Sequence, residues 1–109
     1  MALMMHLYYT GKNGSARRFA EEMTASGLVE RIRAEEGNLC YSYFIPMDDP
    51  ETVLLLDAWS DQAALDAHHA SPVMGEIARL RDRYDLHMRD ERCVMEEDVP
   101  ESDQAFLRK

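Results

Sequence analysis

The sequence predicts an α+β domain in which helices cover one face of an antiparallel sheet. Apolar residues alternate in four segments and recur every three to four positions in the segments between them, which indicates strands and helices respectively. The order is strand, helix, strand, strand, helix, strand, and a short loop with two Asp and a Pro at residues 47–51 joins the two central strands. A chain of 109 residues suits a single domain with a modest core.

Charge and cysteine content narrow the class of protein. The formal net charge is -9 at pH 7, and neither nucleic acid nor membrane is an expected partner because both require a basic surface. The apolar run at residues 3–9, which is the first predicted strand, is too short to span a membrane and lacks the basic residues that precede a signal sequence. Cys40 and Cys93 are far apart, which argues against a disulfide framework. We therefore expect a cytoplasmic protein.

The first half of the chain provides the first helix and the second strand. Gly11–Ser15 lacks the residue order of a phosphate-binding loop and is interpreted as a turn that ends in a capping serine. Residues 16–36 carry a helical apolar stripe, weakened at Thr24–Gly27, so we expect a kink or two shorter helices. Gly37 ends the helix in a left-handed conformation, and residues 38–46 form the second strand.

The second half completes the sheet. It holds the third strand, two helical segments and the fourth strand, at residues 52–59, 61–70, 72–84 and 86–95. The acidic tail, residues 96–109, is either disordered or packed on a partner. This order of elements is the ferredoxin-like split βαβ arrangement, and we expect one domain over residues 1–95.

The third strand is apolar on both faces. Val53 and Leu55 point to one side, and Leu54 and Leu56 point to the other. A sheet with one face in water normally alternates apolar with polar residues, and an uncovered apolar face implies a partner surface. We therefore predict a homodimer, a dimeric α+β barrel in which two sheets pack face to face with the helices outside.

The candidate active pocket lies where the third strand meets the following helix. Asp57 interrupts the apolar strand, and Trp59 shares its face because strand side chains alternate. Ser60 and Asp61 supply a capping hydroxyl and an acid at the start of the helix, and His68 falls on the inner face of that helix. One strand and one helix can therefore bring an acid, an indole and an imidazole together.

Side chains of two other strands are candidates for binding the substrate. Tyr41 and Tyr43 share one face of the second strand. His6 and Tyr8 share one face of the first strand and line the pocket if the helices cover that face. His69 points to solvent, and adjacent histidines on a helix do not converge, so no metal is expected.

The three central residues also have purely structural interpretations. Asp57 could pair with an arginine such as Arg89 or Arg92, because structural ion pairs also place acids in sheets. Trp59 is typical of a core residue whose indole N–H needs a partner. His68 could be a packing residue that makes a hydrogen bond.

A set of residues spread along the chain forms a combined motif. Its members are Phe19, Glu36-Gly37-Asn38-Leu39, Tyr41, Asp49-Pro50, Asp57, Trp59, Ala64, His68 and Ser71-Pro72. In this combination the chain resembles the antibiotic biosynthesis monooxygenase family, which includes quinol monooxygenases and forms dimeric α+β barrels. The likeness covers almost all of residues 2–95, and a nearby branch, the isomerases of the phosphorylated autoinducer sugar, is similar as well.

Several positions depart from the family pattern. The acid before the tryptophan is usually Glu but is Asp57 here, and Val73 replaces a family histidine. Members that degrade haem use Asn, Trp and His at positions that hold Tyr8, His68 and Ala78 in this chain. The iron ligand is therefore missing, which disfavours haem degradation.

The resemblance implies a monooxygenase without a cofactor, and no flavin, nicotinamide or metal motif is visible in the sequence. In this interpretation His68 removes a proton from a quinol or related phenol, and Asp57 orients or charges His68. Trp59 and Tyr41 or Tyr43 stack on the ring or hydrogen-bond to it. The electron-rich anion then reacts directly with dioxygen.

Two alternatives stay open. An isomerase would use Asp57 and His68 as acid and base to move a carbonyl through an enediolate, and would need a phosphate grip from Lys12, Arg17 or a helix start. No convergent basic cluster accompanies the pocket stretch, which favours an uncharged aromatic substrate. The other alternative is a dimeric binding or stress-response module without turnover.

Overall fold

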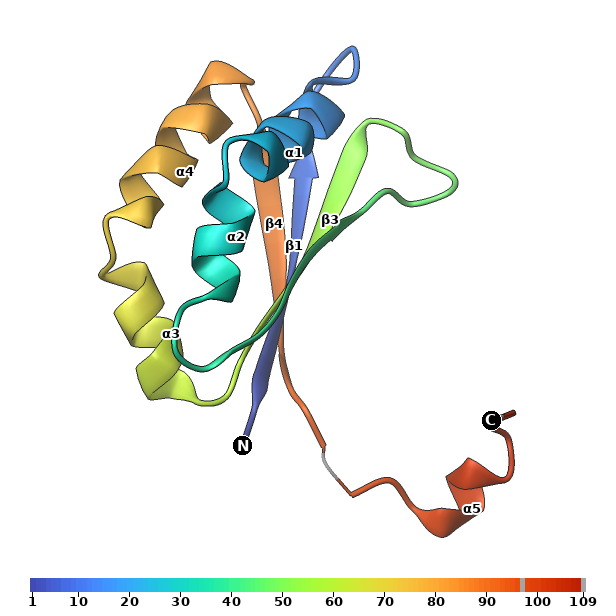
Figure 1. Cartoon of the computed structure of the whole chain (residues 1–109). Helices are drawn as coiled ribbons and strands as arrows, with labels where there is room; N and C mark the ends of the chain where they lie inside the picture. The colour runs from blue at the N-terminus through green and yellow to red at the C-terminus, as the bar shows by residue number, and fades with distance from the viewer. Residues whose placement is uncertain (97, 109) are drawn as a thin grey trace.

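The computed structural model describes residues 1–96 and 98–108, and it has a four-stranded antiparallel sheet with helices on one side (Figure 1). The strands run in the order β2-β3-β1-β4. This arrangement confirms the predicted ferredoxin-like α+β fold. The elements are β1 (Leu3–Thr10), α1 (Ser15–Ala25), α2 (Leu28–Arg33), β2 (Asn38–Phe44), β3 (Thr52–Trp59), α3 (Gln62–His69), α4 (Val73–Arg83), β4 (His87–Val94) and α5 (Glu101–Gln104).

Strand register decides which side chains meet between the sheet and the helices. Asp57 of β3 lies directly opposite Met5 on one side and Tyr41 on the other. Residues in such a row point to the same face of the sheet. Tyr9 lies opposite Val53 on that face, and both are buried. The helix-covered face therefore holds the acid together with aromatic residues from β1 and β2.

The helical layer closes the core over this face. Phe19 and Met23 of α1 and Ile32 of α2 are completely buried, and the ring of Phe19 lies 5.0 Å from that of Tyr9. Gly27 adopts φ 86 between α1 and α2, a left-handed conformation that glycine enters without steric cost. The predicted break within the first helical segment is thus confirmed, and it allows two short helices to follow the curve of the sheet.

Helix ends differ from the prediction in three places. α2 ends at Arg33, before the predicted Glu36, and Gly37 at φ 83 turns the chain into β2. Gly14 and not Ser15 caps α1, because the Ser15 hydroxyl accepts the backbone N–H of Lys12 instead.

α3 has a similar correction at its start. Asp61 caps this helix through a 2.8 Å hydrogen bond that its carboxylate accepts from the backbone N–H of Ala64. Ser60, the predicted capping hydroxyl, precedes the cap. Both residue types are common at the N-terminal end of a helix, and the hydrogen bond to Asp61 identifies Asp61 as the capping residue.

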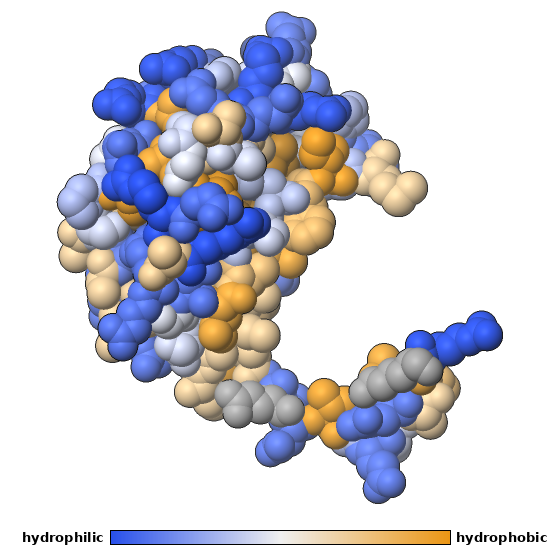
Figure 2. Space-filling view, in the orientation of Figure 1, coloured by the Kyte–Doolittle hydropathy of each residue, from blue (hydrophilic) through white to orange (hydrophobic). Residues whose placement is uncertain are grey.

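The other face of the sheet is not covered by the helices. Leu54 and Leu56 point to it, and Phe44 on the same face is half exposed. Figure 2 shows apolar side chains along the margin of the body that looks toward the tail. Within the described part of the chain, no helix is long and apolar enough to cross a membrane.

After β4 the chain leaves the body, and α5 lies apart from the helical layer (Figure 1). The side chains of α5 are exposed, and Phe106 is 88% exposed. The predicted tail, residues 96–109, includes residues 97 and 109, which lie outside the described residues. The described part of the tail is therefore exposed, and none of the described elements covers it.

Replacement of Gly37 by alanine should destabilise the fold. Gly37 has φ 83, and an added Cβ would lie 2.5 Å from the Cβ of Ala64. We expect Gly37→Ala to lower the free energy of unfolding by roughly 1–3 kcal/mol, from left-handed strain and the close contact together. Urea denaturation measures the change.

The control is Gly75→Ala, because Gly75 lies in α4 and an added Cβ there would meet nothing within 4 Å. This change should be neutral or stabilise by about 0.5–1 kcal/mol. Equal effects of the two substitutions would contradict the role given to Gly37.

Candidate functional site

A buried carboxylate forms the centre of the candidate site. Asp57 is 5% exposed in the middle of β3. Its Oδ1 accepts a 2.7 Å hydrogen bond from the indole Nε1–H of Trp59. Burial raises the pKa of Asp57, whereas the hydrogen bond from Trp59 and the nearby imidazole of His68 lower it, and burial prevails. A carboxyl group of this kind can exchange a proton more readily near neutral pH than an exposed aspartate.

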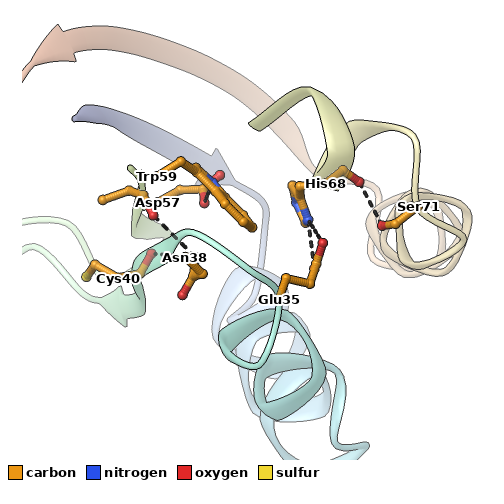
Figure 3. Close-up of polar contacts among 8 residues, drawn as sticks. Glu35, Asn38, Cys40, Asp57, Trp59, His68 and Ser71 are labelled. Atoms are coloured by element: carbon orange, nitrogen blue, oxygen red, sulfur yellow. Dashed lines mark hydrogen bonds and ion pairs between the residues drawn. The ribbon is translucent and has the colours of Figure 1, made fainter. Parts of the chain in front are cut away.

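The imidazole of His68 lies against this pair but is held by a different acid. Its ring stacks on that of Trp59, with centroids 4.6 Å apart and an angle of 27° between the planes. Nδ1 of His68 lies 2.9 and 3.1 Å from the two carboxylate oxygens of Glu35 (Figure 3). The predicted contact of Asp57 with His68 is therefore replaced, because Asp57 bonds to Trp59 and Glu35 takes the imidazole.

Three tyrosines complete the polar lining beside Asp57. Burial raises the pKa of Tyr9 to about 12 and raises those of Tyr41 and Tyr43 as well. The negative charge of Asp57 adds to the rise for all three. The phenols therefore stay protonated over the physiological range and can donate hydrogen bonds to an oxyanion. The hydroxyl of Tyr43 is buried and has no partner among the described residues.

A groove of about 700 Å³ lies beside this cluster, between α1 and the β2–β3 hairpin. It is lined by Arg17, Ala20, Glu21, Thr24, Ala25, Tyr43, Phe44, Ile45 and Val53. Asp57, Trp59 and His68 do not line it, and each is at most 5% exposed. Tyr43 belongs to both places, since its ring lines the groove and its hydroxyl is buried. The acid and imidazole are thus packed behind the groove and not open to it.

The structure brings most of the predicted site residues together. Trp59 contacts both Asp57 and His68, and Tyr41 lies opposite Asp57 with its ring 6.5 Å from that of His68. The ring of Tyr43 lies 5.9 Å from that of Tyr41. One strand, one helix and the neighbouring edge strand therefore supply a continuous row of aromatic and ionisable groups.

His6 and Tyr8 do not join this group. They pair with Leu56 and Leu54 in the register and point to the open face of the sheet. The guanidinium of Arg89 lies 3.8 Å above the ring of Tyr8. A ligand among Asp57, Trp59 and His68 cannot reach them through the sheet, so their predicted place in the pocket is corrected. Alternation fixed that the pair shares a face, but not which face the helices cover.

Sequence reasoning missed two residues of the cluster. In the sequence, Glu35 is interpreted only as part of the end of a helix, and Tyr9 only as a residue of the first apolar strand. The period of β1 placed Tyr9 on the face of Met5, so the pairing of Met5 with Asp57 would have identified it. No periodic signal points to Glu35, because it lies in the turn between α2 and β2.

The arginines proposed as structural partners of Asp57 are engaged elsewhere. Arg92 binds the side-chain oxygen of Gln62, and Arg89 covers Tyr8. Asp57 instead accepts a hydrogen bond from the indole N–H of Trp59. This bond gives the N–H a partner but brings no positive charge to the carboxyl group. Among the described residues, no group of three or more His, Cys, Asp or Glu side chains is arranged to hold a metal ion.

The structure thus brings a buried acid, an indole and an imidazole together between the sheet and the helices of an α+β domain. The sequence matches the family model described as antibiotic biosynthesis monooxygenase over residues 2–80. The chain therefore belongs to the antibiotic biosynthesis monooxygenase family, as its combined motif predicted.

Individual relatives agree with this assignment. The Bacillus subtilis protein YcnE, which has a provisional monooxygenase name, is 33% identical over 67 residues, or 62% of this chain and 68% of its own. A Deinococcus radiodurans structure, provisionally described as an antibiotic biosynthesis monooxygenase, superposes with a TM-score of 0.77 at 15% identity, covering 90% of this chain and 96% of its own. The structure of SnoaB from Streptomyces nogalater, described as a cofactor-independent oxygenase, superposes with a TM-score of 0.73 at 13% identity. The match covers 92% of this chain and 98% of SnoaB. At these identities the two structures support the fold alone.

Asp57→Asn should change how stability depends on pH. A carboxyl group whose pKa is raised in the folded state binds its proton more tightly there than in the unfolded chain. The free energy of unfolding of the protein therefore falls as pH rises. For Asp57 that loss begins near the ordinary pKa of 3.8 and continues through the raised value. Asparagine does not titrate and can still accept the Trp59 N–H. The difference in free energy of unfolding, variant minus wild type, should therefore become more positive from pH 3.5 to 7. A difference that stays constant over this range would contradict the buried-acid assignment.

Proposed function

We propose that the protein is a cofactor-independent monooxygenase that acts on a quinol or a related phenolic aromatic. The observation that carries the proposal is the stack of His68 on Trp59, with Glu35 on the imidazole and the Asp57 carboxylate on the indole. A chain of this family offers here a candidate base, hydrogen-bond donors and a dry aromatic environment. These are the contributions that a protein can make when the electrons come from the substrate itself.

The chemical step begins with proton removal. Because Glu35 occupies Nδ1 of His68, Nε2 is the nitrogen that takes the proton from the phenolic hydroxyl. Protonated tyrosines such as Tyr41 and Tyr43 stabilise the oxyanion. The anion then transfers electrons to dioxygen. One oxygen atom enters the ring and the other leaves as water, so that a quinol and dioxygen give a hydroxylated quinone and water.

Substrate enters, in this proposal, through the groove beside α1. The groove has the volume of a small-molecule site and mostly apolar walls. Its only charged lining residues among those described are Arg17 and Glu21, which lie 3.4 Å apart as an i, i+4 pair. An arginine that faces a glutamate is a poor grip for a phosphate dianion. This favours the aromatic substrate over the phosphosugar of the isomerase alternative.

His68→Ala is the test of the base. We expect it to lower the rate of oxygen uptake with a quinol roughly 10²- to 10⁴-fold, which is the usual contribution of general base catalysis. His69→Ala is the matched control, because His69 is the next residue of α3 and is exposed, and its rate should stay near that of the wild type. An oxygen electrode measures both.

A phosphosugar ketose assayed in parallel separates the alternatives. Carbonyl migration without oxygen use would replace the monooxygenase proposal with the isomerase. Ligand binding with no turnover of either compound, unchanged in His68→Ala, would replace both with a binding module.

We also propose that two copies pair through the open face of the sheet, with the helices outside and the tail of residues 96–109 packed on the partner. Leu54, Leu56 and Phe44 give this face its apolar character. The described part of the tail lies on the same side of the body as this face and exposes Phe106 (Figures 1 and 2). Burial of both surfaces in a dimer would remove apolar area from water.

A charge on the open face should dissociate the dimer. Leu56→Glu would place a carboxylate between two apolar sheets, and we expect it to shift the protein from dimer to monomer at micromolar concentration. Thr24→Glu adds the same charge on the exposed side of α1 and should leave the dimer intact. Sedimentation velocity measures both variants, and a wild-type protein that sediments as a monomer would contradict the pairing.

A further inference from the structure

We infer that Glu35 is the positioning residue of the site: its carboxylate fixes the tautomer and orientation of His68 so that Nε2 faces the reaction as an unprotonated base. The inference rests on the proposed function for its catalytic meaning. The tautomer itself is a property of the protein without substrate. Asp57, the acid expected for this role from the sequence, is bonded to Trp59 and leaves the role to Glu35.

The contact between Glu35 and His68 is close and partly shielded. Both carboxylate oxygens lie within hydrogen-bond distance of Nδ1, at 2.9 and 3.1 Å. The His68 side chain is 3% exposed and that of Glu35 is 24% exposed. A charge-assisted bond at this depth is stronger and less screened by salt than a surface ion pair. Figure 3 shows the carboxylate of Glu35 meeting the edge of the ring.

Backbone hydrogen bonds hold the turn that carries Glu35. The N–H of Glu35 donates to the carbonyl of Ile32 at 3.0 Å, and the carbonyl of Glu35 accepts from the N–H of Asn38 at 3.2 Å. The turn between α2 and β2 is thus bonded on both sides of the residue. The backbone of Glu35 therefore has a defined position relative to α3.

The imidazole is confined on its other sides. Its face stacks on Trp59 at 4.6 Å, and the edge-on ring of Tyr41 lies 6.5 Å away. Ser71 donates a 2.7 Å hydrogen bond to the backbone carbonyl of His68 and anchors the end of α3. Ring rotation is therefore restricted, and the remaining variable is which nitrogen holds the proton.

The carboxylate of Glu35 determines which imidazole nitrogen carries the hydrogen, because an ionised carboxylate only accepts hydrogen bonds. The neutral imidazole must place its hydrogen on Nδ1 to bond to Glu35, which leaves the lone pair on Nε2. When Nε2 takes a proton, the resulting imidazolium keeps the Glu35 contact and gains a charge interaction. Glu35 thus acts on the substrate only through His68.

The test compares Glu35→Gln with Glu76→Gln. Glu76 makes a 2.9 Å ion pair with Arg31, and its side chain is 36% exposed against 24% for Glu35, so the control removes the same charge and an equally short contact. In ¹⁵N-resolved NMR, with the neutral imidazole observed, the wild type and Glu76→Gln should show His68 protonated on Nδ1. Glu35→Gln should show both tautomers or Nε2–H, because the amide can turn its NH₂ group toward Nδ1.

Turnover gives the second measurement. Glu35→Gln should lower kcat for oxygen uptake roughly 10- to 100-fold with KM nearly unchanged, as a fraction of the 10²- to 10⁴-fold that a general base contributes. Glu35→Asp should recover part of the loss, and Glu76→Gln should match the wild type. The Nδ1–H tautomer in Glu35→Gln, or an equal loss of kcat in both glutamine variants, overturns the inference.

Failure of the proposed function is distinguishable from failure of this inference. A wild type that consumes no oxygen with any quinol, but shows the Nδ1–H tautomer that Glu35→Gln alters, would reject the monooxygenase and retain the role of Glu35 in fixing the ring. If Glu35→Gln fails to fold, the tautomer populations of Glu35→Asp decide, because a shorter carboxylate keeps the acceptor and moves it back from Nδ1.

Discussion

The burial of one carboxylate in the middle of the sheet constrains the rest of the structure. Asp57 occupies a position where its neighbours along β3, Val53 and Leu55, are apolar and almost inaccessible. A buried charge is costly unless it is both paired and hydrogen-bonded, and otherwise the pKa of the group shifts toward the neutral form. The indole of Trp59 supplies that bond from the same strand, two residues along. One neutral donor does not offset the loss of solvation, so burial still raises the pKa of Asp57 and leaves a proton-binding group at the centre of the aromatic cluster.

The same strand gives the two faces of the sheet different tasks. Odd-numbered residues of β3 join the cluster under the helices, whereas Leu54 and Leu56 reach the open face. Side-chain alternation makes these roles inseparable, because a shift of one residue would exchange them. Pairing of two copies and enclosure of the site would then depend on a single register between β1 and β3. The proposed dimer covers the back of the strand that carries the acid.

The sequence was sufficient for the parts of this design that depend on local period. It gave the bounds of β3, the shared face of Asp57 and Trp59, and the break before α2. It could not give the contact of Glu35 with His68, because that contact joins a turn to a helix far along the chain. Nor could it decide the face of His6, since alternation is symmetric until a helix covers one side.

In the proposed function, the substrate has to reach a cluster whose acid and imidazole are almost inaccessible in this structure. Tyr43 lines the groove, its ring lies 5.9 Å from that of Tyr41, and Tyr41 lies opposite the buried acid in the register. An oxygen acceptor on a bound phenol would satisfy the buried hydroxyl of Tyr43, for which the hydrogen bonds of the described residues provide no partner. A site that stays dry until its substrate arrives would protect an electron-rich anion from protonation by water, which is the condition for direct reaction with dioxygen.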